Sequence, residues 1–199
     1  MELAYSTTSP FVRKVLIVAQ ELGIADRIKN VPTHPHTDKD RLTPINPLSM
    51  VPAFKTDAGE ALFDSPVICD YLDVTFGKNR FIPASGDRRW QVLKIQALAD
   101  GVLDASLLVR YELGRPAAQQ SAEWKDRQMG RMRDGIDALE KVVDSFGSEI
   151  DLRHVAVACM IGYVLLRFPD DKMFDKAPKL TAFYKTIMQR PSFATTAPK

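Results

Sequence analysis

Cysteine and long apolar runs are scarce in this chain, and neither sign of charge prevails. Cys69 and Cys159 are the only cysteines in 199 residues, so no disulfide framework is expected and a reducing cytoplasm fits best. The 27 lysines and arginines face 25 acids with no block of like charge, which argues against a nucleic-acid interface. The longest apolar run, from Val155 to Leu166, is shorter than the about 20 residues that span a bilayer, and the acidic Glu2 does not fit a signal peptide. We therefore expect a cytoplasmic protein that binds neither nucleic acid nor membrane.

What is present suffices for a folded core. Hydrophobic residues make up 45% of the chain and charged residues 26%, a balance typical of globular domains. At roughly 150 residues per domain, the length allows one large or two small domains. The pattern changes at the turn-rich segment 77–86. The sequence thus predicts one domain over residues 1–77 and an all-helical domain over residues 87–199.

The first part of the chain reads as an α/β unit. Short apolar runs predict strands, and Ser or Asp followed by Pro predicts capped helix starts. In chain order, the expected elements are a strand at 3–5, a helix from Ser9-Pro10, a strand at 27–31, a hairpin formed by 51–55 and 61–63, and a helix opened by Asp64-Ser65-Pro66. This order indicates a small mixed sheet covered by helices.

The second part reads as helical throughout. A long helix is expected from Asp87 to about Leu113 and a last one over residues 178–190. Between them, Asp151 is expected to cap an almost wholly apolar, buried helix. Spacings of four and three predict a core stripe formed by Met132, Ile136, Leu139, Val143 and Phe146.

Ser9 has two interpretations. The first is a plain helix N-cap, which the pattern alone favours. In the second, the positive end of the helix and the Ser9 hydroxyl would together stabilise a ligand thiolate. Lowering a thiol pKa from about 8.5 to about 6.5 requires roughly 2.7 kcal/mol, which a charged hydrogen bond of about 1.5–3 kcal/mol and a helix end of about 0.3–1 kcal/mol can supply. The neighbouring Ser6 could compete for this role.

Other polar residues have structural interpretations that compete with functional ones. Arg13 and Lys14 are expected to be a solvated pair or partners of distant carboxylates, with a field that favours anions as the alternative. His34 and His36 are expected in a solvated loop, because no third ligand lies nearby. The two cysteines are expected to be inert core thiols.

Two further features could bind a ligand. A cis bond between Val51 and Pro52 would turn the Val51 backbone toward a peptide-like ligand, although few X–Pro bonds are cis. Asp64 and Ser65 could simply cap their helix, or could hold the ammonium and carboxylate of a zwitterion. Two helix ends at one sheet edge would suit a small zwitterionic peptide.

Three motifs, taken together, resemble the N-terminal domain of bacterial cytosolic glutathione S-transferases. They are Ser9-Pro10-Phe11-Val12-Arg13-Lys14, Asn46-Pro47-Leu48-Ser49-Met50-Val51-Pro52 and Asp64-Ser65-Pro66. Leu98-Ala99-Asp100-Gly101, the buried helix from Asp151 and the ending Arg190-Pro191-Ser192-Phe193 resemble the helical domain of the same family. The resemblance covers nearly the whole chain and implies a thioredoxin-like domain followed by an all-helical domain.

The resemblance also implies an activity and its residues. Ser9 would be the catalytic residue, donating to a glutathione thiolate that attacks a small apolar electrophile. The glutathione site would consist of Phe11, Val51, Pro52, Asp64 and Ser65. Val51-Pro52 would be the cis-proline segment that binds the cysteinyl part, and Asp64 and Ser65 would bind the γ-glutamyl end. Glutathione is then a co-substrate, and no metal is expected.

Further expectations concern the second substrate and assembly. Asp104, Leu107 and Tyr111 share one helix face, where the family's second substrate is usually bound; alternatively, they are core and solvated residues. A homodimer is implied, with Asp100 or Asp104 near its axis.

Two departures from the family pattern leave contacts and stability in question. Met50 replaces a basic or polar residue near the glycine carboxylate, and His154 replaces the acid that completes the capping box of the helix from Asp151. The competing hypotheses are a non-catalytic binding protein with the same fold, or an isomerase, dehalogenase or peroxidase that uses glutathione.

Overall fold

The computed structural model describes residues 1–198, which form two compact units. The first comprises Met1–Gly86 and the C-terminal segment from Pro191, and the second comprises Asp87–Arg190. The first unit therefore continues beyond the predicted end at residue 77: Phe81 and Ile82 are buried, and their N–H groups donate to the Asp73 carboxylate at 2.9 and 2.7 Å.

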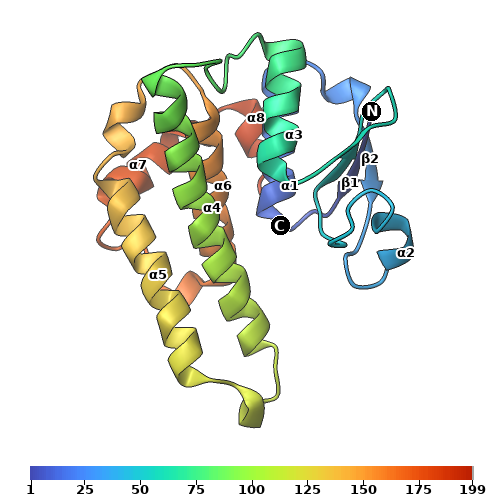
Figure 1. Cartoon of the computed structure of the whole chain (residues 1–199). Coiled ribbons are helices and arrows are strands. Elements are labelled where there is room, and N and C mark those ends of the chain that lie inside the picture. The colour runs from blue at the N-terminus through green and yellow to red at the C-terminus, as the bar shows by residue number, and fades with distance from the viewer. Residues whose placement is uncertain (199) are drawn as a thin grey trace. The chain divides into compact units, whose positions relative to one another are not determined.

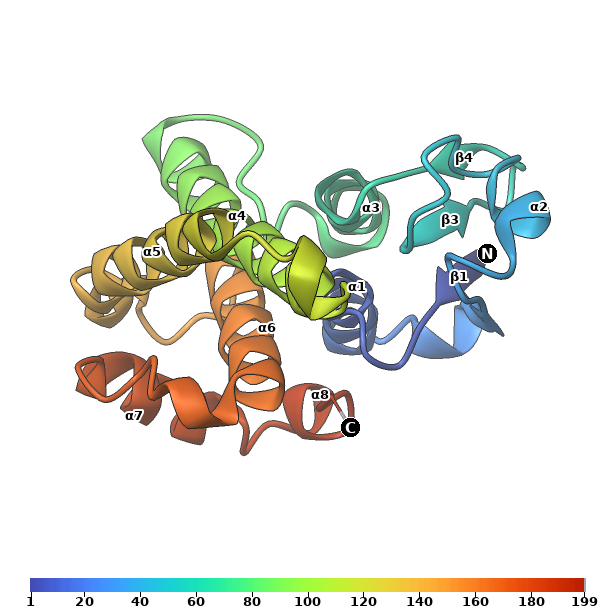
Figure 2. The same cartoon turned by 90° about the horizontal axis from the view of Figure 1, so that it is seen from below.

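The first unit is a thioredoxin-like α/β domain. Its mixed sheet has the order β2-β1-β3-β4, with β1 parallel to β2 and the other pairs antiparallel. Figure 2 shows α1 and α3 on one side of the strands and α2 on the other. The elements are β1 (Glu2–Tyr5), α1 (Pro10–Glu21), β2 (Lys29–Pro32), α2 (Lys39–Leu42), β3 (Ala53–Lys55), β4 (Ala61–Leu62) and α3 (Ser65–Leu72), followed by a π turn at Asp73–Gly77.

Local sequence explains where these elements begin and turn. Pro10 and Pro66 stand in the first turn of α1 and α3, where a missing N–H costs nothing. The predicted hairpin is confirmed: β3 and β4 pair across a turn closed by the Thr56 N–H donating to the Glu60 carbonyl at 2.9 Å. Gly59 within this turn has φ of 88°, a conformation that glycine adopts without steric cost.

The second unit is all-helical, as expected. Figure 1 shows α4 and α5 running side by side, with α6 packed against α4. Gly135 on α5 permits this close approach, because a Cβ there would collide with the Val102 side chain on α4. The helices are α4 (Asp87–Leu113), α5 (Ala122–Glu140), α6 (Leu152–Arg167) and α7 (Pro178–Ile187).

The predicted core stripe and cap of this unit are confirmed. Met132, Ile136, Leu139, Val143 and Phe146 are all buried, although the last two lie in a 3-10 turn after α5. The buried helix α6 is N-capped by the Asp151 side chain, as the sequence predicts. The stability question raised by the histidine at the third helical position is answered, because His154 itself completes the capping box.

The C-terminal helix α8 (Pro191–Ala194) packs on α1. The Ser192 hydroxyl donates to the Glu21 carboxylate at 2.6 Å, and the same carboxylate accepts from Arg80 at 3.0 Å. The sequence pattern assigned this segment to the helical domain, but its contacts place it with the first unit. This assignment depends on contacts between α8 and α1, which are far apart in the sequence.

Candidate functional site

Sheet register brings the three candidate segments to one end of the sheet. Ala4 on β1 faces Ala53 on β3, so one further step puts Tyr5 level with Pro52. The register of β3 with β4 likewise continues to bring Asp64 level with Pro52. The segment after β1, the segment before β3 and the start of α3 therefore meet at the same edge. The topology thus brings together candidate residues that lie in three separate segments of the sequence.

Ser9 is the N-cap of α1, as expected. Its Oγ accepts a hydrogen bond from the Val12 N–H at 3.3 Å. A hydroxyl that accepts one hydrogen bond still has its own hydrogen to donate. Capping the helix and donating to a ligand thiolate are therefore compatible roles for this side chain, and the cap does not decide between them.

A polar pocket of about 290 Å³ opens beside Ser9 within the first unit. Ser6 and Thr7 line it together with Ser9, so Ser6 and Ser9 border the same space. Thr195 and Thr196 of the C-terminal segment also line it. The pocket does not decide whether Ser6 or Ser9 would donate a hydrogen bond to a ligand thiolate.

Ser65 differs from an ordinary helix-start serine. The residue is fully buried, yet its Oγ has no hydrogen-bond partner among residues 1–198. The Asp64 side chain stands at the N-cap of α3 but makes no capping hydrogen bond to any of residues 1–198. The simple capping interpretation of this pair is therefore wrong. A buried hydroxyl without a partner costs about 1–3 kcal/mol, which points to a ligand as its partner.

The Val51-Pro52 bond is cis, as the resemblance implies. The loop before it is held by Asn46, which is buried. The Asn46 amide donates to the Met50 carbonyl at 2.9 Å, and its side-chain oxygen accepts from the Leu48 N–H at 3.0 Å. Met50 itself is 52% exposed and presents an apolar side chain there.

The expected solvent exposure of Arg13 and Lys14 is wrong. Their exposed fractions are 4% and 0%. The Arg13 guanidinium donates to the Phe193 carbonyl at 3.0 Å, and the Lys14 ammonium lies 5.2 Å from the centre of the half-buried Phe11 ring. Both cations are therefore packed inside the first unit and not solvated.

The second-substrate residues all lie on α4. Asp104 is exposed, Leu107 is half-buried, and Tyr111 is 51% exposed with its ring 5.9 Å from the Arg110 guanidinium. Tyr111 is thus not a core residue. The assignment of this face to an electrophile stays a prediction.

The remaining expectations concern metals, thiols and membranes. Within the described chain no three potential metal ligands cluster, and the His34 and His36 rings, both on exposed residues, lie 5.5 Å apart. Cys69 and Cys159 are buried and form no disulfide. None of the helices in residues 1–198 combines the length and apolarity needed to cross a membrane.

Comparison with known proteins decides the family. Residues 8–75 match the sequence profile described as "Glutathione S-transferase, N-terminal domain". A relative from Escherichia coli (strain K12), "Uncharacterized GST-like protein YibF", is 36% identical over 201 residues, covering 100% of this chain and 98% of the relative. The chain belongs to the glutathione S-transferase family. A fish relative, glutathione S-transferase A of Pleuronectes platessa, is 24% identical over 212 residues, covering 100% of this chain and 91% of the relative.

Solved glutathione S-transferase structures share the fold along the whole chain. A glutathione transferase family member from Pseudomonas fluorescens Pf-5 with bound glutathione superposes with a TM-score of 0.94 at 38% identity, covering 100% of this chain and 98% of that one. A glutathione S-transferase from Methylobacillus flagellatus KT, also with glutathione bound, gives a TM-score of 0.92 at 32% identity, covering 100% and 99%.

Sequence reasoning missed three features of this site. They are the burial of Arg13 and Lys14, the anchoring of the proline loop by Asn46, and the C-terminal threonines beside Ser9. The Phe193 carbonyl that accepts from Arg13 and the threonines that line the pocket beside Ser9 lie at the far end of the chain, so no local pattern reveals them. The sequence does carry a signal for Asn46, because an asparagine followed by proline favours a turn that the asparagine side chain can close.

Proposed function

We propose that this protein is a glutathione transferase whose glutathione site lies at the sheet edge described above. The observation that carries the proposal is the buried Ser65 hydroxyl without a partner in residues 1–198. It stands at the start of α3, where N–H groups and the helix dipole favour a carboxylate. The γ-glutamyl carboxylate of glutathione supplies an acceptor of the right charge, and Asp64 beside it suits the ammonium.

The register of β3 with β4 supports a position for the cysteinyl part of glutathione. The cysteinyl part would pair with the Val51 backbone next to the cis-proline, which lies level with Asp64 in the sheet. Phe11, in the first turn of α1, would add a half-buried wall. Relatives that share the fold at 38% and 32% identity hold glutathione in their crystal structures, which supports this assignment.

Ser9 would act on the sulfur. Its Oγ accepts from Val12 and would donate its hydrogen to the thiolate, while the N-terminal end of α1 adds a favourable dipole. The thiolate then attacks an electrophilic carbon and forms a C–S bond. In a substitution, the electron pair of the breaking bond leaves with the leaving group. In an addition to an activated double bond, the π pair moves onto the electron-withdrawing group, and a proton from solvent completes the product. Serine does not act as a base here, so the thiol proton goes to solvent.

The electrophile site and the assembly of the protein are two further parts of this proposal. Asp104, Leu107 and Tyr111 would contact the small apolar electrophile. The protein would work as a homodimer in the cytoplasm, with Asp100 or Asp104 near the axis. The length of α4, 27 residues or about 40 Å, supports a helix that extends past its own unit's core, and a symmetric dimer is the commonest oligomer.

A non-catalytic binding or regulatory protein with the same fold is the second candidate. The exposed, apolar Met50 favours it, because a methionine side chain cannot donate a hydrogen bond to the glycine carboxylate of glutathione. Retention on immobilised glutathione, followed by conjugation to chlorodinitrobenzene, separates the candidates. Retention with turnover supports the transferase, and retention without turnover on a panel of electrophiles supports the binding protein. Failure of retention would contradict the transferase and support the binding or regulatory protein.

A further inference from the structure

The C-terminal segment, residues 191–198, is fastened to the end of α1 by side-chain hydrogen bonds. The Ser192 hydroxyl donates to the Glu21 carboxylate at 2.6 Å. The Thr195 hydroxyl donates to the side-chain oxygen of Gln20 at 3.2 Å. These contacts join parts of the chain that lie more than 170 residues apart, and they hold the segment along the helix.

Arg13 joins the same segment to the start of α1. Its buried guanidinium donates to the Phe193 carbonyl at 3.0 Å and, through Nε, to the Thr196 hydroxyl at 3.4 Å. The Arg13 backbone N–H donates to the Ser9 carbonyl at 3.1 Å. A carbonyl at the N-cap accepts the first backbone hydrogen bond of its helix. One hydrogen bond therefore separates Ser9 from the residue that is anchored on the C-terminal segment.

The polar pocket beside Ser9 makes this anchor important. The turn from Ser6 to Ser9 is closed by the Ser9 N–H donating to the Ser6 carbonyl at 3.3 Å, and it borders the pocket. Thr196 and Ala197 border the same pocket. Because about 290 Å³ of open space lies there, the turn lacks the contacts that packed side chains would give it on this side. The position of Ser9 therefore depends on the first turn of α1, which Arg13 holds.

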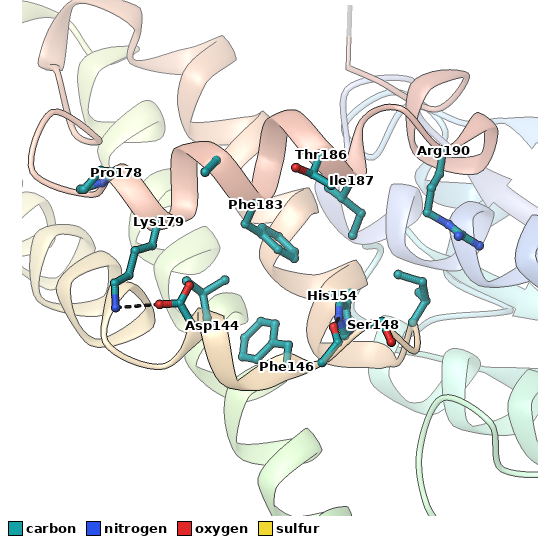
Figure 3. Close-up of a pocket in the computed structure, with 14 residues that line it drawn as sticks. Asp144, Phe146, Ser148, His154, Pro178, Lys179, Phe183, Thr186, Ile187 and Arg190 are labelled. Atoms are coloured by element: carbon teal, nitrogen blue, oxygen red, sulfur yellow. Dashed lines mark hydrogen bonds and ion pairs between the residues drawn. The ribbon is translucent and has the colours of Figure 1, made fainter.

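The C-terminal segment takes no part in the pocket of the second unit. That pocket has a volume of about 770 Å³ and lies between α7 and the segment that joins α5 to α6 (Figure 3). Its lining ends at Arg190, and none of residues 191–198 contributes to it. The segment that follows α7 thus contributes to the pocket beside Ser9 instead.

We propose that Arg13 and the C-terminal segment that it binds are positioning elements, which fix the Ser9 hydroxyl where it donates to the glutathione thiolate. The inference rests on the proposed transferase function for its catalytic part. Arg13 acts through the start of α1 and does not touch the substrate. The C-terminal segment supports the helix that carries Ser9.

Amide hydrogen exchange of Val12 in the ligand-free full chain measures how firmly Ser9 is held. The Val12 N–H lies in the first turn of α1, where a helix offers no backbone acceptor, and it donates to the Ser9 Oγ at 3.3 Å. Arg13→Met removes the anchor and should speed this exchange at least about tenfold, which corresponds to about 1.4 kcal/mol. The Trp124 N–H, which donates to the Ser121 hydroxyl in the second unit, is the internal reference and should not change. Unchanged exchange at Val12 would overturn the proposal.

A milder pair of variants covers the case in which Arg13→Met does not fold. Thr196→Val removes the hydroxyl that accepts from Arg13 without a change of charge, and should speed exchange at Val12 about threefold. Thr195→Val is the matched control, because Thr195 lies on the same segment and lines the same pocket but contacts Gln20 instead. It should leave exchange at Val12 unchanged. Equal effects of the two valines would show a general loosening of the segment and would overturn the role of Arg13.

The pKa of the bound glutathione thiol separates positioning from a purely structural role. The ultraviolet absorbance of the thiolate is titrated with pH, and Arg13→Met should raise the thiol pKa by about 1. Arg13→Lys keeps the charge and a donor, and should restore part of this change. The affinity for S-methylglutathione, which keeps the peptide but has no thiol, should stay within about twofold of wild type.

Two combined results would contradict positioning. Faster exchange at Val12 with an unchanged thiol pKa would give Arg13 a structural role alone. A raised thiol pKa with unchanged exchange at Val12 would mean that Arg13 acts through its charge and not through the position of Ser9. A wild-type complex without a thiolate signal would instead contradict the role of Ser9 in the proposed function, and exchange at Val12 would still decide whether Arg13 fixes that residue.

Discussion

The Asn46 side-chain amide donates a hydrogen bond to the Met50 carbonyl at 2.9 Å, one residue before the cis Val51-Pro52 bond. The same side chain accepts from the Leu48 N–H at 3.0 Å, so it closes the loop from both sides. A buried asparagine thus holds the backbone that would pair with glutathione.

Substitution of Asn46 should therefore weaken glutathione binding without removing any contact to it. Asn46→Ala leaves two backbone groups without their partner, which costs about 1–3 kcal/mol of stability. Asn46→Asp keeps the acceptor for Leu48 but loses the donor to Met50. We expect the KM for glutathione to rise in both variants, measured below the unfolding temperature of each. An unchanged KM in Asn46→Asp would show that the Met50 contact does not position the site.

Ser65→Ala should separate binding from stability. The hydroxyl has no partner within residues 1–198, so its removal should leave the free energy of unfolding unchanged or raise it. Glutathione would lose a charge-assisted hydrogen bond worth about 1.5–3 kcal/mol, a loss that calorimetric titration measures directly. Asp64→Ala should also weaken binding without loss of a cap, because the Asp64 side chain makes no capping bond in the described chain.

Ser121→Ala is the matched control for these two variants. The Ser121 hydroxyl does cap its helix, accepting from the Trp124 N–H at 3.2 Å. Its loss should cost about 1 kcal/mol of stability and leave glutathione affinity unchanged. If Ser65→Ala behaves like Ser121→Ala, the hydroxyl has only a structural role.

Ser9→Ala should impair turnover more than glutathione binding. Loss of a hydrogen bond to the thiolate, about 1.5–3 kcal/mol, raises the pKa of the bound thiol by about 1–2 units. The pH profile of kcat then moves to higher pH, and the ultraviolet absorbance of the bound thiolate moves with it. The lost cap adds about 1 kcal/mol of instability, which is measured separately. Ser6→Ala serves as the comparison, and a shift seen only in Ser6→Ala would transfer the role to Ser6.

Local patterns made most of the fold predictable. Caps such as Ser9 and Asp151 and the stripe from Met132 to Phe146 depend on residues within a few turns of one another, so the sequence states them directly. The fate of Arg13 depends on Phe193, 180 residues away, and was predicted wrongly. A pattern that spans a few residues cannot show such a partner.

The sequence predicts which residues form the candidate site, but not the hydrogen bonding and burial of their side chains. Val51, Pro52, Asp64 and Ser65 were marked by sequence, and the sheet register explains why they gather. That the Ser65 hydroxyl is buried without a partner, whereas Ser9 caps its helix, depends on packing around each side chain. Two serines with the same local signature thus differ because of tertiary structure.

Assembly gives a further test. Sedimentation at micromolar concentration should show a dimer of the 22.3 kDa chain, with and without glutathione. Charge at the proposed axis would be probed by Asp100→Asn, which should shift the association constant more than Asp137→Asn at an exposed position of α5. A 22.3 kDa species alone under both conditions would contradict the homodimer.

Acid stability should reveal the cap of α6. Burial alone would raise the pKa of Asp151, but the neighbouring His154 and Arg153 side chains outweigh it and lower the pKa to about 2 from an ordinary 3.8. A carboxyl whose pKa is depressed in the folded state contributes stability above its ordinary pKa and loses it as the pH falls through the folded value. The contribution of Asp151 should therefore be full above about pH 4 and vanish toward pH 2. A shift of this size corresponds to at most about 2 kcal/mol, less what solvent screening removes.

Denaturant unfolding across this pH range measures the effect. The difference in free energy of unfolding between wild type and Asp151→Asn should be constant above about pH 4 and shrink steadily below it. Asp137→Asn, exposed on α5, controls for the loss of one negative charge. His154→Ala removes one partner of the carboxylate and should narrow the pH range over which stability is lost, because Arg153 still donates to it at 2.9 and 3.1 Å and Arg88 at 2.9 Å. If the difference in free energy of unfolding between wild type and Asp151→Asn stays the same down to pH 2, Asp151 stabilises α6 through its hydrogen bonds and independently of its charge.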